Sequence, residues 1–297
     1  MTATVLSETI LPQLPSASGV EIIGATAYIV SDDAPYLYRL DAATLAAAPP
    51  LRLFESAEFG SGRIPKATKP DLESMAAVPG PDGTPSLLLF GSGSGPRRCR
   101  GYLVSQLSAA TPQVQPLDLT ALYQHLGLPA AVQLNIEAAA TTATELLLLQ
   151  RTVGGGPCYL LSLPLADTLV HLQAPGTPPP APTRCLPLPL PVLDGWAAGL
   201  SGATFLNGRL YVTASVEATA DAVLDGTVLG SFVGCLDLAT ATATFARLLW
   251  ADGRPYLGKV EGLAVRRQLP PKALELLLVT DDDQGGSTAL HAVLREG

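Results

Sequence analysis

The sequence predicts an all-β fold: a single five-bladed β-propeller of four-stranded blades, closed by the N-terminal strand. Short runs of about five to eight β-favouring residues recur between Gly, Pro, Asn and Asp residues, and only 119–126 has the pattern of a short helix. Several runs, such as 87–90 and 276–279, are apolar without alternation, which is typical of strands covered on both faces. These runs recur about once in every sixty residues, which indicates a repeated unit.

A short strand that contains a polar residue precedes each apolar run. Aligning the chain on these opening strands gives five repeats, whose polar residues are separated by 52, 64, 64 and 60 residues. Such spacings are typical of four-stranded propeller blades with variable loops. The aligned polar residues are Glu21, Glu73, Glu137, Ser201 and Glu261.

Further strands follow the opening strand of each repeat in chain order. Second strands are predicted at 27–30, 86–90, 145–149, 209–212 and 275–279. Third strands are predicted at 36–40, 101–107, 158–163, 228–236 and 288–294. Fourth strands are predicted at 51–54, 114–117, 185–190 and 244–248, which leaves the last repeat one strand short. The segment 4–10 precedes the first repeat and can supply that strand, which closes the ring and removes a sheet edge.

The resulting single domain covers 1–297. Its blades span 19–56, 71–118, 132–191, 198–248 and 258–294, and 3–10 completes the last blade. A six-bladed ring is the alternative, with the extra blade hidden in 166–198. That stretch carries consecutive prolines at 178–180 and alternating prolines from 187 to 191, which favour a long loop and an edge strand. We therefore favour five blades.

The charge and the N-terminus exclude several classes of protein. Acidic residues outnumber basic residues 26 to 18, and the net charge of −8 argues against a nucleic-acid or anionic-membrane partner. The N-terminus has neither a basic segment nor a long apolar one, and no apolar run approaches the roughly 18 residues of a membrane span. The sequence thus predicts a cytoplasmic protein with four free cysteines, and it leaves the oligomeric state open.

The five aligned polar residues are expected to converge near one mouth of the channel, because the inner strand of each blade lines it. Four carboxylates in a low-dielectric channel raise each other's pKa values unless they are compensated. They can bind a cation, pair with cationic side chains or backbone N–H groups, or share protons. Carboxylate and hydroxyl oxygens suit Ca²⁺, so we predict a calcium ion held by this ring, with the other two arrangements as alternatives.

The loops on the same mouth supply two further sets of charged residues. The acidic turns contain the candidate general bases Asp32, Asp33 and Asp281. A basic set could bind the phosphate or carboxylate of a small anionic substrate, or could instead neutralise the glutamate ring. The basic residues are Lys66, Lys69, Arg98, Arg151 and Lys259.

Three segments resemble the blade motifs of the calcium-activated nucleotidases (apyrases). They are Lys259-Val260-Glu261-Gly262, the run 28–33 followed by Tyr36-Leu37-Tyr38, and Gly199-Leu200-Ser201-Gly202. This resemblance implies a five-bladed propeller with one calcium in its central tunnel, although Glu21 stands where that family would place a serine. The chain as a whole resembles a bacterial five-bladed propeller family of unassigned function, including the segment 217–231 and the turn 280–283.

Two functional hypotheses follow. In the first, the propeller is a metal-dependent hydrolase of a phosphate- or ester-containing small molecule, and the metal polarises an oxygen and orients a water. In the second, it is a non-catalytic propeller. A structural cation or a Glu/Lys/Arg network then fills the channel, and the mouth binds a small anion or a protein partner.

Overall fold

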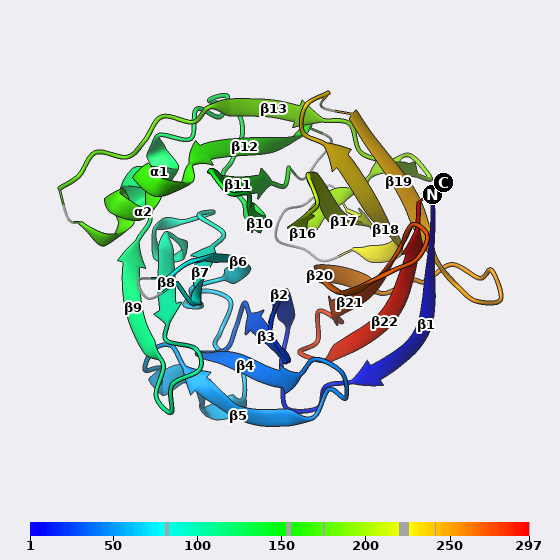
Figure 1. Ribbon diagram of the computed structural model, residues 1–297, viewed down its shortest axis with the longest axis horizontal. Coiled ribbons are helices and arrows are strands. Elements are labelled where there is room, and N and C mark those ends of the chain that lie inside the picture. The colour runs from blue at the N-terminus through cyan, green and yellow to red at the C-terminus, as the bar shows by residue number, and fades with distance from the viewer. Residues whose placement is uncertain (81–82, 153–155, 175, 220–225, 241, 297) are drawn as a thin grey trace.

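The protein, described by a computed structural model, is a β-propeller with its sheets arranged around a central channel (Figure 1). The structure describes every residue except 81–82, 153–155, 175, 220–225, 241 and 297. Part of the predicted motif segment 217–231 therefore lies outside the described residues. The two termini lie next to each other at the rim of the ring (Figure 1). The predicted propeller fold is confirmed.

Each blade is a four-stranded sheet whose strands follow one another from the channel to the rim (Figure 1). The first contains β2 (Ala17–Ile23), β3 (Thr26–Ser31), β4 (Tyr36–Asp41) and β5 (Ala47–Arg52). The second contains β6 (Leu72–Pro79), β7 (Pro85–Gly91), β8 (Arg100–Ser105) and β9 (Gln113–Asp118). The third contains β10 (Ile136–Thr141), β11 (Glu145–Gln150), β12 (Cys158–Pro164) and β13 (Arg184–Leu188). The fourth contains β16 (Gly199–Leu206), β17 (Arg209–Ala218), β18 (Thr227–Asp237) and β19 (Thr242–Trp250).

The last blade is closed by the N-terminal strand, as its position in the sequence predicts. It contains β20 (Lys259–Leu269), β21 (Ala273–Asp281), β22 (Ser287–Arg295) and β1 (Thr2–Ile10). The strand β1 pairs antiparallel with β22 along its length. It also pairs parallel with β19, from Ala3 opposite Leu248 to Val5 opposite Trp250. The first strand of the chain therefore joins the fourth and fifth blades into one eight-stranded sheet.

The stretch 166–198 does not form a blade of its own. It contains most of the helix α2 (Leu165–Gln173), then β13, and then a small hairpin of β14 (Val192–Leu193) and β15 (Trp196–Ala197). The helix was not predicted, because the proline-rich composition of the region favoured a loop. The predicted short helix is confirmed as α1 (Thr120–Gln124). The described residues also form two 3₁₀ turns, η1 (Ala57–Ser61) and η2 (Pro96–Arg98).

The hydrophobic core lies between neighbouring blades, which explains the apolar runs. In β7, Leu88 and Phe90 pack in one cluster with β11 of the third blade, whereas Leu87 and Leu89 pack with Val30 of the first blade. All four side chains in β7 are fully buried. Alternate residues of one strand thus serve two different cores, as strands covered on both faces must. No helix in the described part of the chain is long and apolar enough to cross a membrane.

A β-bulge interrupts the first pairing of every blade at the same place. In each case one residue of the inner strand is left unpaired near its N-terminal end, where it is turned toward the channel. The bulged residues are Ser18, Glu73, Glu137, Ser201 and Glu261. This repeated bulge positions the ring of polar side chains.

Small residues follow the bulges because the inner strands approach each other closely. A Cβ atom on Gly202 would lie 2.8 Å from the Cα atom of Gly262. A Cβ atom on Gly262 would lie 3.1 Å from the Cα atom of Gly19. Both distances are too short for a larger residue without backbone movement, so glycine is required where three inner strands meet.

Candidate functional site

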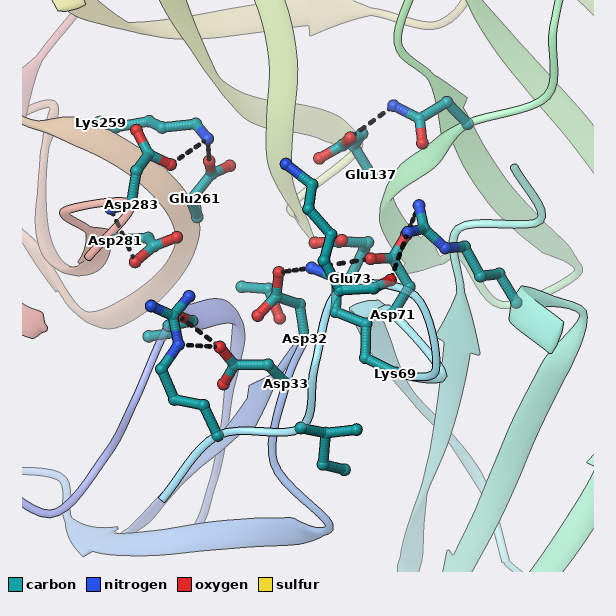
Figure 2. Close-up of a pocket in the computed structure, with 18 of the residues that line it drawn as sticks. Asp32, Asp33, Lys69, Asp71, Glu73, Glu137, Lys259, Glu261, Asp281 and Asp283 are labelled. Atoms are coloured by element: carbon teal, nitrogen blue, oxygen red, sulfur yellow. Dashed lines mark hydrogen bonds and ion pairs between the residues drawn. The ribbon is translucent and has the colours of Figure 1, made fainter. Parts of the chain in front are cut away.

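A charged cavity of about 480 Å³ opens at one mouth of the channel. It is formed where the inner strands begin and the second strands end, as propeller geometry predicts (Figure 2). Its carboxylic residues are Asp32, Asp33, Asp71, Glu73, Glu137, Glu261, Asp281 and Asp283. Its basic residues are Arg63, Lys66, Lys69, Arg98, Arg151 and Lys259. All the predicted general bases and all the predicted basic residues therefore lie at one site.

The channel below the cavity is nearly closed. The space between the inner strands at the level of the bulges is only about 10 Å³. A cavity needs roughly 10–15 Å³ of this kind to hold one water molecule. The charged cavity is thus a blind pocket, and a ligand must enter and leave by the mouth.

The predicted ring of five residues needs one correction. Glu73, Glu137 and Glu261 line the cavity, and Ser201 lies in the narrow channel below it. Glu21 is not among the residues that line either space. It pairs with Tyr28 three residues beyond the bulge, and burial raises its pKa to about 8. The first blade instead contributes Ser18, so the ring carries a serine where the nucleotidase resemblance would place one.

The two serines of the ring connect neighbouring blades. Ser18 Oγ donates to the carbonyl oxygen of Leu72 at 2.5 Å, immediately before the bulge of the next blade. Ser201 Oγ donates to the carbonyl oxygen of Val260 at 2.5 Å, which is the equivalent contact between the fourth and fifth blades. Both hydroxyls are buried, so these hydrogen bonds hold the inner strands together.

One group of charged residues surrounds Lys69 and is named here the Lys69 cluster (Figure 2). Lys69 Nζ pairs with Asp32 Oδ2 and lies 2.9 Å from Asp71 Oδ1. Arg98 lies 2.9 Å from the other oxygen of Asp71. Burial, followed by the charges of Asp71 and Glu137, raises the pKa of Glu73 well above its usual value. The Lys69 cluster consists of Asp32, Lys69, Asp71, Glu73 and Arg98.

Asp32 has one satisfied and one unsatisfied oxygen. Its Oδ2 atom binds Lys69, whereas its Oδ1 atom is buried and has no hydrogen-bond partner among the described residues. Burial raises the pKa of Asp32 to about 6 despite the opposing charge of Lys69. A buried acceptor without a partner is unfavourable by about 1–3 kcal/mol, so this oxygen is poised to accept a proton or a cation.

A second group, the Lys259 cluster, joins three blades. Arg151 of the third blade pairs with Glu217 of the fourth and lies 3.8 Å from Glu137. Lys259 of the fifth blade lies 3.1 Å from Glu261, 2.9 Å from Asp283 and 3.6 Å from Glu217. The Lys259 cluster consists of Glu137, Arg151, Glu217, Lys259, Glu261 and Asp283.

The carboxyl groups of the Lys259 cluster differ in proton affinity. Burial would raise the pKa of Glu217, but the charges of Arg151 and Lys259 lower it overall. Burial outweighs the same two cations at Glu261 and raises its pKa to about 8. Glu217 is therefore held ionised at neutral pH, whereas Glu261 is largely protonated.

The three predicted general bases have different surroundings. Asp33 is buried and accepts hydrogen bonds from Ser16 Oγ at 3.0 Å and from Arg63 Nε at 2.5 Å. These partners hold Asp33 in the wall of the cavity and occupy its acceptor positions. Asp281 is only half-buried, and burial together with the charge of Asp32 raises its pKa to about 7. Asp281 is thus better placed than Asp33 to exchange a proton at neutral pH.

Comparison with known proteins places the chain in a family. A family model described as a family of unknown function (DUF6929) matches residues 13–294. The chain belongs to the DUF6929 family. No curated protein matches the sequence. The resemblance to the calcium-activated nucleotidases stays a prediction.

The DUF6929 chain is similar in fold to solved structures. It is similar to glutaminyl cyclase of Myxococcus xanthus, with a TM-score of 0.53 and 13% identity over 100% of this chain and 98% of that chain. It is also similar to an α-L-arabinanase of Penicillium chrysogenum complexed with arabinobiose, with a TM-score of 0.47 and 11% identity over 96% and 83% of the two chains. At such low identity, the likeness to the cyclase shows the propeller fold alone.

The arrangement of the DUF6929 mouth does not fit a calcium ion at the five-residue ring. Two of its glutamates pair with Arg151 and Lys259, and its two serines donate to backbone carbonyls. Asp32, Asp71 and Glu73 do offer oxygen atoms within 4.8 Å of one another. However, Lys69 Nζ already contacts two of these carboxylates, and a metal there must displace it. The alternative Glu/Lys/Arg network describes these contacts better.

Sequence reasoning missed several residues of the DUF6929 site. In four of the five blades the residue two positions before the bulge also lines the cavity, and Asp71 and Asn135 are two of these residues. The signal was present, because Ser18-Gly19 matches Ser201-Gly202 and Glu261-Gly262 and fixes the correct alignment. By contrast, the sequence could not show the partners of Arg63, in the loop between the first two blades, or of Glu217, at the end of β17.

Proposed function

We propose that this DUF6929 propeller is a hydrolase-like enzyme that acts on a small polar molecule by carboxyl acid–base chemistry. The observation that carries the proposal is a blind cavity lined by carboxyl groups of contrasting proton affinity. Groups whose surroundings separate their pKa values are typical of active sites that need both an acid and a base.

The roles follow from the protonation states at neutral pH. Asp281, with its pKa near 7, is available in ionised form to take a proton from an attacking water. Glu73, with its pKa raised well above the usual value, holds a proton that it can give to the leaving group. Such proton transfers each contribute about 10²–10⁴-fold to an enzymatic rate.

Three non-glycine residues at the mouth have left-handed backbone conformations, which supports a functional site there. Ser16, Asp71 and Asp283 have φ values of 41°, 58° and 59°, in the left-handed region that favours glycine. Non-glycine residues in this region are held there by surrounding structure at a cost of about 1–3 kcal/mol, and they cluster at functional sites. Here all three line the charged cavity.

A hydrolysis screen tests the proposal. The purified protein would be incubated at pH 7 with 4-nitrophenyl esters, glycosides and phosphate, with lactones and with amino-acid amides. We expect turnover of at least one compound, and we expect Asp281→Asn and Glu73→Gln each to lower kcat at least 100-fold. Glu55→Gln is the matched control, because Glu55 is exposed and pairs with Arg52 outside the cavity. The proposal is wrong if no compound of the panel is turned over, or if Asp281→Asn and Glu73→Gln both keep full activity.

A second candidate function is a non-catalytic propeller whose mouth binds a ligand. The observation that favours it is the Lys259 cluster, whose ion pairs join three blades as a structural network would. In that case ligands would shift the melting temperature of the protein, and no compound of the panel would be consumed.

A further inference from the structure

We infer that the cavity recognises its small-molecule ligand through a primary ammonium group, held by the carboxylates around Asp32. The inference rests on the proposed function, because it names the substrate class of the same site. It differs from the small anionic ligand that the basic residues of the sequence predict.

The ion pairs of the cavity disfavour an anionic ligand, because they already engage its basic groups. Eight carboxylic residues face six basic residues. Four basic groups already pair with carboxylates: Lys69 and Arg98 with Asp71, Arg151 with Glu217, and Lys259 with Asp283. An incoming phosphate or carboxylate would have to displace these carboxylates from their cations.

Asp32 offers a position that a cation can complete. The buried Oδ1 atom of Asp32 has no partner in the described part of the chain, while Oδ2 is bound to Lys69. Asp281 lines the same cavity as Asp32 (Figure 2), and burial, followed by the charge of Asp32, raises its pKa to about 7. A positive group near the carboxylates of Asp32 and Asp281 would donate a hydrogen bond to the unpaired Oδ1 atom and reduce the repulsion between the two carboxylates.

The protein itself shows that these surroundings suit an ammonium group. Lys69 and Lys259 each place a compact ammonium against at least two carboxylates of the cavity. An ammonium has three donors and binds in the same way whether it belongs to a side chain or to a ligand. The closed channel and the cavity volume of about 480 Å³ limit the rest of the ligand to a small molecule.

Proton linkage distinguishes a cationic ligand from an anionic one. Burial raises the pKa values of Asp32, Asp281 and Glu261 to about 6, 7 and 8, so these groups are partly protonated near pH 7. A bound ammonium favours their ionised forms and therefore releases protons. A bound phosphate or acetate would cause proton uptake instead.

Calorimetric titration at pH 7 tests the inference, with ethanolamine and glycinamide as probes and ethylene glycol, acetate and phosphate as comparisons. Measurements in two buffers of different ionisation enthalpy, neither of them a primary amine, give the number of protons released. We expect both amines to bind with proton release and the three comparison compounds to show at least tenfold weaker binding. Asp32→Asn and Asp281→Asn should each weaken amine binding at least tenfold, with Glu55→Gln unchanged.

The outcomes separate this inference from the proposed function. Amine binding without turnover in the hydrolysis screen overturns the enzymatic proposal alone. Turnover of a neutral or anionic substrate without amine binding overturns the ammonium inference alone. Proton uptake with phosphate or acetate, or unchanged amine affinity in both folded aspartate variants, also overturns it.

Discussion

The Lys69 cluster and the Lys259 cluster place similar charges at one mouth but in different structural settings. Lys259 belongs to an inner strand, and its cluster joins three blades through Arg151 and Glu217. Lys69 lies in the loop before β6, and its cluster leaves a buried oxygen of Asp32 unsatisfied. Similar composition therefore serves two purposes. The Lys259 cluster stabilises the ring, whereas the Lys69 cluster keeps a reactive position for a ligand.

Replacing Arg151 gives the largest expected loss of stability. Arg151→Met leaves the largely buried side chain of Glu217 without its closest cation, and breaking such a pair lowers the free energy of unfolding by about 3–5 kcal/mol. Chemical denaturation measures this change. Arg254→Met is the matched control, because Arg254 and its partner Asp252 are exposed, and we expect little change there. Equal losses in the two variants would show that the Lys259 cluster stabilises the ring no more than an exposed ion pair does.

Replacing Lys69 should lower stability less than replacing Arg151 and should create a calcium-binding site. Lys69→Met leaves Asp32, Asp71 and Glu73 within 4.8 Å of one another without their ammonium. Because burial raises the pKa values of Asp32 and Glu73, these two carboxyls can take up protons, and we expect a loss of about 2 kcal/mol. Calcium should restore part of this loss in the variant and should stabilise the natural protein much less. Melting curves with and without CaCl₂ measure both effects, and equal stabilisation of the two proteins would restore the calcium prediction.

The two ring serines, Ser18 and Ser201, each make one hydrogen bond to the next blade, so their replacement compares the two sides of the mouth. Ser18→Ala and Ser201→Ala each remove one buried hydrogen bond to the next blade, so each should lower the free energy of unfolding by about 1 kcal/mol. The two losses should add in the double variant, since the sites are in different blades. A double variant that loses clearly more than the sum would show that the two sides of the mouth are coupled.

Much of the fold could be predicted because it depends on patterns within one repeat. The run 87–90 supplies two neighbouring cores and therefore has no polar face, which identified it as a strand covered on both faces. The N-terminal strand was predicted from the missing fourth strand of the last repeat, and this is confirmed. The helix α2 was missed because prolines around it dominated the composition of the region.

The site was less predictable because its contacts cross between repeats. Glu73, Glu137 and Glu261 follow from the periodicity, whereas the first repeat was aligned on Glu21, three residues beyond the equivalent residue Ser18. Sequence spacing places Asp33 and Asp281 at the same mouth. It cannot show that Arg63 pairs with Asp33, because that contact depends on how the loop between the first two blades folds.

The dependence of stability on pH should differ in sign between two glutamates of the mouth, with an effect of about 1 kcal/mol or about 2 °C in melting temperature. Glu73 has a raised pKa, so its contribution is fully present below the usual glutamate pKa and is lost as the pH rises. Glu217 has a lowered pKa, so its contribution is present above the usual value and is lost as the pH falls below it. At pH 8, Glu73→Gln should therefore stabilise the protein and Glu217→Gln should destabilise it. Melting temperatures at pH 5 and pH 8 test this, and shifts of the same sign at pH 8 would show that one electrostatic environment governs both clusters.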